Sequence, residues 1–145
     1  MDQERHRLLF LDIDGVLIVD GGGGYGFDNP DPVLVGRVKS LADRAGVKII
    51  LSSLWRLSGK KRTQLSQLGL TLHGCTPELS GRGRAAEIAA YVASFRRAHT
   101  DAEIDYVIFD DDDGAGIAGH FYLCDPETGL TDEIARSVHL RWSGW

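Results

Sequence analysis

The sequence has no long apolar run, and none approaches the roughly 20 residues that a helix needs to cross a bilayer. The first residues, from Met1 to Arg5, are polar and mixed in charge, so the apolar region of a secretory signal peptide is missing there. We therefore expect neither a membrane-spanning helix nor secretion, and a cytoplasmic location follows as the expectation.

Cysteine and positive charge are also scarce. The two cysteines, Cys75 and Cys124, lie near the ends of apolar segments, and we expect buried free thiols rather than a disulfide or a metal pair. Lys and Arg number 16 against 21 Asp and Glu, which gives a formal net charge of -5. This balance argues against general electrostatic binding of nucleic acid, although a local basic patch is compatible with it.

What the sequence does contain is a regular alternation of strand-like and helix-like segments. Its 145 residues fit one domain, 1–145, without a linker or repeat. The alternation predicts an α/β fold, a three-layer Rossmann-like sandwich around a mainly parallel five-stranded sheet. Strands are expected at 8–11, 47–51, 70–72, 104–109 and 121–124, and helices at 32–45, 58–68, around 85–95 and from 132 onward.

Between the first strand and the first helix, residues 16–19 and a glycine-rich run at 21–26 predict a short hairpin with a glycine-rich tip. We interpret this hairpin as a small flap beside the functional site. The remaining length allows only short insertions, so no large cap domain is expected. An uncapped site would be open, which favours bulky substrates or closure by a partner.

Two of the predicted strands end in clustered carboxylates. The run 8–11 leads into Asp12-Ile13-Asp14-Gly15, and the run 106–109 leads into four acids, Asp110 to Asp113. In α/β sheets, ligands bind beyond the carboxyl ends of the strands. Acids gathered there are costly unless a cation or a reacting group uses them. The two clusters therefore predict one divalent-metal site, and oxygen ligands of this kind suit Mg²⁺.

The first cluster also suggests acid–base chemistry. Side chains alternate along a strand, so Asp12 and Asp14 can face one substrate. One carboxylate would be an ionised nucleophile and metal ligand, and the other a proton donor with a raised pKa. The alternative is that one caps a turn and the other is solvated.

These segments resemble the motifs of the haloacid dehalogenase-like (HAD) phosphohydrolase superfamily. Asp12-Ile13-Asp14-Gly15-Val16 is similar to its first motif, Asp-x-Asp-Gly-(Thr/Val). The segment 47–52, which ends in Ser52, is similar to the second motif, and the segment 106–111, which ends in acids, is similar to the fourth. The order and the spacing agree, and the resemblance covers nearly the whole chain.

The resemblance implies a Mg²⁺-dependent phosphomonoesterase that forms an aspartyl-phosphate. Asp12 would be the nucleophile. Asp14 would protonate the leaving oxygen, then activate water, and lend its backbone carbonyl to Mg²⁺. Ser52 would hydrogen-bond the phosphoryl group, and Asp110 and Asp111 would complete the metal site.

The third motif departs from the family pattern. The superfamily usually has a Lys there, but this chain has no Lys after Lys61. Arg82 and Arg84 are the candidates, because Arg binds phosphate in a bidentate manner. We favour Arg82 as the catalytic cation, since it precedes the helix, and assign Arg84 to substrate binding. The missing Lys also motivates an alternative, a catalytically weak or inactive relative that binds a phosphorylated ligand or partner.

Further substrate-binding residues are expected beside the second motif. Together with Gly15 and Ser53, Arg56 could bind a phosphate and Trp55 could stack on a base, although Trp55 in the core is the alternative. Lys60 to Arg62 begin a predicted helix, where cations are unfavourable unless an anion offsets them or they extend into solvent. The segments 51–56, 81–83 and 129–131 resemble small HAD domains of RNA-repair proteins. The expected substrate is accordingly a phosphorylated small molecule or nucleic-acid end.

Overall fold

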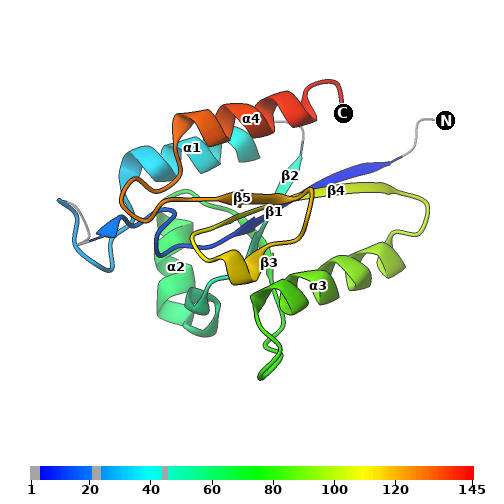
Figure 1. Ribbon diagram of the computed structural model, residues 1–145, viewed down its shortest axis with the longest axis horizontal. Helices are drawn as coiled ribbons and strands as arrows, with labels where there is room; N and C mark the ends of the chain where they lie inside the picture. Colours follow the sequence, from blue (N-terminus) through cyan, green and yellow to red (C-terminus); the bar gives the residue numbers. More distant parts are fainter. Residues whose placement is uncertain (1–3, 21–23, 44–45) are drawn as a thin grey trace.

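The computed structural model describes residues 4–20, 24–43 and 46–145 and shows a parallel sheet between two layers of helices (Figure 1). The strand order is β3-β2-β1-β4-β5, and every neighbouring pair is parallel. The strands are β1 (Arg5–Leu11), β2 (Val47–Leu51), β3 (Leu72–Cys75), β4 (Glu103–Asp110) and β5 (Phe121–Leu123). The helices are α1 (Pro32–Ala42), α2 (Gly59–Gln67), α3 (Arg84–Ala98) and α4 (Asp132–Trp142), with short 3-10 helices η2 (Leu54–Leu57) and η3 (Asp113–Ala115). The predicted α/β fold class is confirmed, and the residues that the structure describes form no large cap domain.

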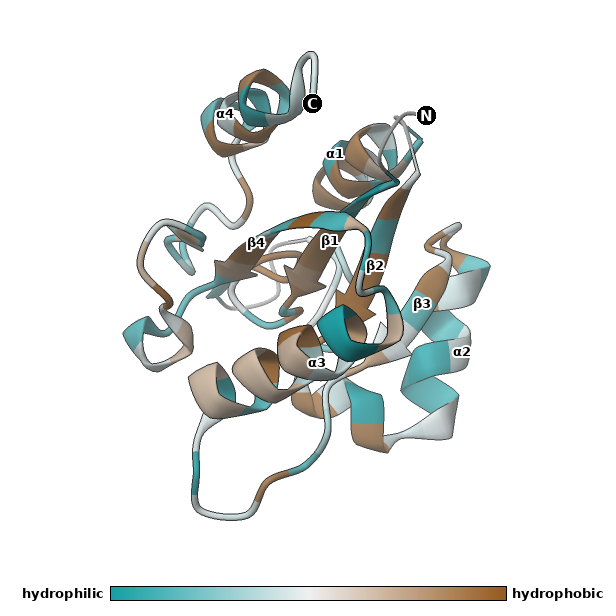
Figure 2. Cartoon of the chain, turned by 90° about the vertical axis from the view of Figure 1, so that its right-hand side faces the viewer, coloured by the Kyte–Doolittle hydropathy of each residue, from teal (hydrophilic) through white to brown (hydrophobic). Residues whose placement is uncertain are grey.

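The core consists of two apolar layers, one on each face of the sheet. In Figure 1, α1 and α4 lie together on one face and α3 lies on the other. Along β1 the side chains alternate, so Leu9 and Leu11 join the cluster beneath α1 and α4, while Leu8 and Phe10 join the cluster beneath α3. Burial on both faces explains why the carboxyl-terminal parts of the central strands, 8–11, 49–51 and 107–109, are continuously hydrophobic (Figure 2).

Side-chain caps set the starts of three helices, as the sequence predicts. The Asp31 carboxylate accepts a hydrogen bond of 2.8 Å from the Val33 amide, and Pro32 occupies the first helical position. Ser58 caps α2 and Thr131 caps α4 in the same way. The predicted third strand is displaced to Leu72–Cys75, because the Leu70 amide donates to the Leu65 carbonyl and so belongs to the end of α2.

The predicted hairpin flap is wrong in the part that the structure describes. Residues 14–18 form a tight turn with a single bridge between Asp14 and Ile18. Val16, Leu17 and Ile18 are buried in the core beneath α1 and α4, so they are not the arms of an exposed flap. Their apolar side chains are accounted for by this packing. The glycines at 21–23 lie outside the described residues.

The topology places a crevice at the carboxyl ends of β1 and β4. The chain leaves β1 toward α1 on one face of the sheet. It leaves β4 through η3, whose Ala115 packs beneath α3 on the other face. Because neighbouring strands send their connections to opposite faces here, this edge is where a doubly wound sheet binds its ligand.

Two expectations from composition can be compared with the structure. Cys75 and Cys124 are free thiols, and Cys124 is buried while Cys75 is half-buried. Among the described residues, no helix is both long and apolar enough to cross a membrane.

Candidate active site

Three strands deliver polar side chains to the crevice on the side that faces α3. Asp12 and Ser52 directly follow β1 and β2, and Asp110 ends β4. Hydrogen bonds of 3.0 Å continue the ladders, from the Asp12 amide to the Phe109 carbonyl and from the Ser52 amide to the Leu11 carbonyl. The residue two positions before each of these polar residues points into the apolar layer beneath α3, and these three earlier residues are paired in register. Because side chains alternate along a strand, Asp12, Ser52 and Asp110 point to the same face. Those earlier residues are Phe10, Ile50 and Ile108.

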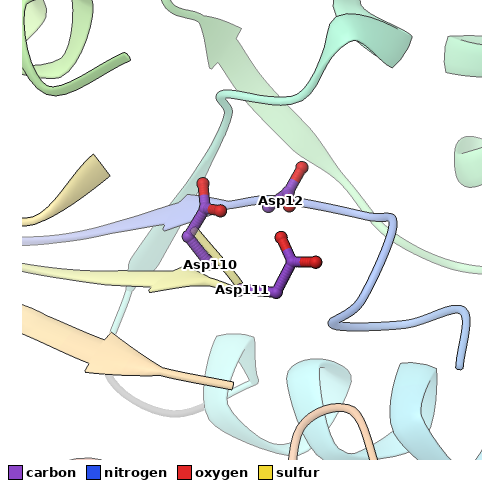
Figure 3. A group of neighbouring side chains, drawn as sticks. All are labelled: Asp12, Asp110 and Asp111. Atoms are coloured by element: carbon purple, nitrogen blue, oxygen red, sulfur yellow. The ribbon is translucent and has the colours of Figure 1, made fainter. Parts of the chain in front are cut away.

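The centre of the site is a cluster of three carboxylates, Asp12, Asp110 and Asp111 (Figure 3). One oxygen from each lies within 4.8 Å of the others. Asp12 is 3% exposed and Asp110 is 0% exposed, whereas Asp111 is half-buried. The four-acid run therefore divides, with its first two members in the cluster. Asp112 is exposed, and its carboxylate caps η3.

Gly15 is required by the close approach of Asp111. Its φ is 81°, and a Cβ there would lie 2.2 Å from Asp111 Oδ2. The Gly15 amide donates to the Ile18 carbonyl at 2.8 Å, so it is committed within the turn. The role of Gly15 in the geometry is thus to make room for Asp111, and its part in substrate binding stays a prediction.

Arg84, rather than Arg82, reaches the carboxylates. Its Nη1 lies 2.7 Å from Asp110 Oδ2 and 3.3 Å from Asp12 Oδ1. Arg84 is the first residue of α3. It lies one helical turn before the buried Glu87 and Ile88, and therefore on the side of the helix that faces the sheet. Arg82 lies in the preceding turn, where its amide donates to the Leu79 carbonyl, and its side chain is exposed. The geometry therefore places Arg84, and not the preferred Arg82, at the carboxylates.

The electrostatics of the cluster favour a bound cation. Burial, followed by the neighbouring Asp110 carboxylate, raises the pKa of Asp12 to about 8, and Arg84 only partly opposes this rise. Burial and Asp110 also raise the pKa of Asp111. One guanidinium does not balance three carboxylates, and an all-oxygen donor set is the kind that Mg²⁺ takes. The residues present therefore fit the metal that the sequence predicts.

A cavity of about 200 Å³ opens onto this cluster. Asp14 is exposed at its wall, as a group that meets substrate from the solvent side would be. Leu54 lines the cavity while 67% exposed, and the sequence analysis missed it because a single Leu carries no signal. The full lining is Asp12, Asp14, Ser53, Leu54, Arg84, Asp111 and Asp112.

The two serines after β2 have different environments. Ser52 is fully buried, and its Oγ has no hydrogen-bond partner within the ranges that the structure describes. Ser53 Oγ accepts from the Trp55 amide at 3.1 Å and so caps η2. A buried hydroxyl without a partner is costly in the folded protein. Ser52 therefore carries an unsatisfied hydroxyl beside the crevice, although Ser52 is not one of the residues that line the cavity.

Trp55 and Arg56 do not lie open to substrate. Trp55 is 2% exposed and packs in the core, which is the second of the two environments that the sequence left open for it. Arg56 is 5% exposed, and its guanidinium donates to the carbonyls of Ser52, Ser53 and Thr76. The expected phosphate contact of Arg56 is therefore wrong, because these donors are already used inside the protein.

Arg56 is instead one half of a buried ion pair. Its Nη2 lies 3.1 Å from Glu87 Oε2, and the same oxygen accepts from the Leu79 amide at 2.9 Å. Glu87 belongs to the first turn of α3, three residues after Arg84. The pair therefore ties the end of β2 to the segment that carries Arg84. The sequence prediction did not include Glu87. An acid next to Ile88 on the apolar face of a helix could have indicated a buried carboxylate that needs a cationic partner.

Comparison with known proteins agrees with this geometry. Residues 8–135 match the family described as the HAD domain in Swiss Army Knife RNA repair proteins. No curated protein and no solved structure gives a significant match. The matched range contains the carboxylate cluster, Ser52 and Arg84, and the predicted resemblance is confirmed. The chain belongs to the family of HAD domains found in Swiss Army Knife RNA repair proteins.

Proposed function

We propose that the protein is a Mg²⁺-dependent phosphomonoesterase that works through an aspartyl-phosphate on Asp12. The family suggests phosphohydrolase chemistry in RNA repair, which makes the end of a nucleic-acid strand the favoured substrate class. The observation that carries the proposal is the buried Asp12 carboxylate, held 3.3 Å from Arg84 Nη1 and clustered with Asp110 and Asp111 at an open cavity.

The first half of the reaction transfers the phosphoryl group to the protein. A carboxylate oxygen of Asp12 bonds to phosphorus while the ester P–O bond breaks, and Asp14 gives a proton to the leaving oxygen. Arg84 stabilises the charge on the phosphoryl oxygens and on Asp12, and Ser52 Oγ donates a hydrogen bond to one of those oxygens.

The second half regenerates Asp12. Asp14, now ionised, takes a proton from water, and the water oxygen bonds to phosphorus as the Asp12–phosphorus bond breaks. Asp12, Asp110, Asp111 and the Asp14 carbonyl would hold Mg²⁺, which offsets the charge that the phosphate brings to three carboxylates. The protein residues supply the nucleophile, the proton carrier and the positioned cation.

Removing the metal is expected to abolish turnover. The assay measures phosphate release from an aryl phosphate and from 3′- and 5′-phosphorylated oligonucleotides, with Mg²⁺ or with EDTA. Without a divalent cation the phosphate dianion would enter a site of excess negative charge, so release should stop in EDTA and return when Mg²⁺ is added back. Release that persists in EDTA would contradict the proposal.

Arg84→Ala is expected to lower kcat by about 10²–10³-fold, the usual cost of one lost transition-state donor. The physical reason is that Arg84 alone among the described basic residues contacts both Asp12 and Asp110. Arg82→Ala is the matched control, since Arg82 is exposed in the turn just before α3. A larger loss in Arg82→Ala than in Arg84→Ala would restore the assignment made from the sequence.

The second candidate function is a catalytically weak relative that binds a phosphorylated ligand or partner. It is favoured by the Arg in place of the usual Lys and by the contact that already joins Arg84 to Asp110 at 2.7 Å. Efficient release from any member of the substrate panel would exclude it. Tight binding of the phosphorylated oligonucleotides without release would support it over the phosphatase.

A further inference from the structure

A hollow of about 360 Å³ lies between the turn at residues 26–29 and the start of α2. A hydrogen bond of 2.7 Å from Gln64 Nε2 to the Asp28 carbonyl joins its two walls. The 3-10 helix η2 connects it to the cavity, because Leu54 lines the cavity and Ser58, directly after η2, lines the hollow. At the 3-10 rise, these two residues are about 8 Å apart. The basic hollow, as we call it, is lined by Asp28, Asn29, Ser58, Lys60, Lys61 and Gln64.

The charge on the two sides of the cavity differs. The loop after β4 brings the acids Asp111 and Asp112 to one side, and η2 after β2 leads to Lys60 and Lys61 on the other, with β1 between them. Lys60 is exposed and has no hydrogen bond or ion pair with any residue that the structure describes. A polyanion that enters the cavity would therefore be repelled on the β4 side and attracted on the α2 side.

Exposed apolar side chains gather along the same path. Of the seven large hydrophobic side chains exposed in the described ranges, four are Tyr25, Phe27, Leu54 and Leu57. Tyr25 is 49% exposed and Phe27 is 72% exposed, and they directly precede the hollow's Asp28. Exposed aromatic side chains next to a basic groove are the combination that binds single-stranded nucleic acid, because bases stack on the rings and phosphates follow the cations.

We propose that the basic hollow, with Tyr25 and Phe27, is a subsite for the single-stranded nucleic acid that continues from the terminal phosphate. This inference rests on the proposed function, which places that phosphate in the cavity. The lysines would contact the next phosphates and the two rings would stack on bases. An acidic peptide matches the lysines but offers no run of flat bases to the rings, so we commit to a nucleic-acid strand.

The test measures binding of short fluorescent oligonucleotides, RNA and DNA, to Asp12→Asn protein, which holds substrate without turnover. Lys60→Ala/Lys61→Ala and Tyr25→Ser/Phe27→Ser are each expected to weaken binding at least about tenfold, and for the aromatic variant this is the scale of losing one stacked base. The lysine variant should also lower the salt dependence of log Kd by about 1.4, since single strands contribute about 0.7 per phosphate contact and two contacts are lost. Lys39→Ala/Arg97→Ala removes the same charge from the ends of α1 and α3 and should bind as Asp12→Asn alone does.

The outcomes separate this inference from the proposed function. Equal weakening by the hollow variants and the Lys39/Arg97 control would mean that only net charge matters, and would overturn the subsite. Binding of a poly-glutamate peptide as tight as that of the oligonucleotide would overturn it too. Phosphate release with no effect of the hollow variants would reject the subsite alone. Loss of oligonucleotide binding in those variants, with no release by the wild type, would support the subsite and reject the phosphatase.

Discussion

Asp12→Asn is expected to reduce phosphate release by about 10³-fold or more, because an amide cannot act as the nucleophile. The change keeps the size of the side chain and an oxygen that faces Arg84 Nη1, so the geometry should persist. The measurement is steady-state phosphate release at saturating Mg²⁺ for the best substrate of the panel. Turnover near the wild-type value would contradict the role of Asp12.

The same substitution is expected to stabilise the metal-free protein. The folded pKa of Asp12, about 8, lies above the unfolded value of roughly 4, so ionisation costs stability as pH rises through that window. Asn has no such charge. Urea unfolding in EDTA should therefore show an advantage of Asp12→Asn over the wild type that grows between pH 5 and pH 8.

The control for both measurements is Asp113→Asn. Asp113 is exposed in the same four-acid run and does not line the cavity. Its replacement removes one negative charge without touching the cluster. It should leave turnover and metal-free stability close to the wild-type values, and an effect as large as that of Asp12→Asn would mean that overall charge is responsible.

Arg56→Met is expected to lower the free energy of unfolding by about 3–5 kcal/mol, the cost of leaving one member of a buried ion pair without its partner. Glu87 would remain buried, and the carbonyls of Ser52, Ser53 and Thr76 would lose their donor. Urea or thermal unfolding measures this loss. Phosphate release should fall as well, since the pair holds the segment that carries Arg84.

A double-mutant cycle tests the pair itself. Arg56→Met/Glu87→Leu should be less destabilised than the sum of its single changes, because neither charge is then left buried alone. Arg136→Ala is the matched control, since its ion pair with Asp132 is exposed and should cost less than about 0.5 kcal/mol. Additive losses across the cycle would show that Arg56 and Glu87 do not act as a pair.

Local rules in the sequence predicted most of the fold and the centre of the site. The caps at Asp31, Ser58 and Thr131 depend on residues within one helical turn, so the sequence contains all that determines them. The convergence of Asp12 and Asp110 follows from parallel strands ending at one edge of a sheet. The helix caps and the convergence of the two acids therefore follow from the local geometry of the chain. They do not depend on how distant segments pack.

Choices between nearby residues required the tertiary structure. Arg82 and Arg84 are separated by Gly83, and Gly81 and Gly83 have φ of 76° and 87°, so the path of that turn is not set by local preference. Only the docking of α3 on the sheet decides which arginine meets Asp110. Val16 to Ile18 likewise belong to the core because α1 and α4 cover them, which their own pattern does not indicate.

The sequence by itself determined the α/β class, the family motifs and the carboxylate cluster, since each depends on periodicity or on the ends of strands. The tertiary structure decided that Trp55 is core, that Arg56 is bound to Glu87, and that Arg84 contacts the buried carboxylates. Burial is the physical reason for the difference. Whether a charged or aromatic side chain is exposed to solvent depends on segments distant in the chain. The sequence around an Arg is the same whether that Arg binds a phosphate or a buried carboxylate.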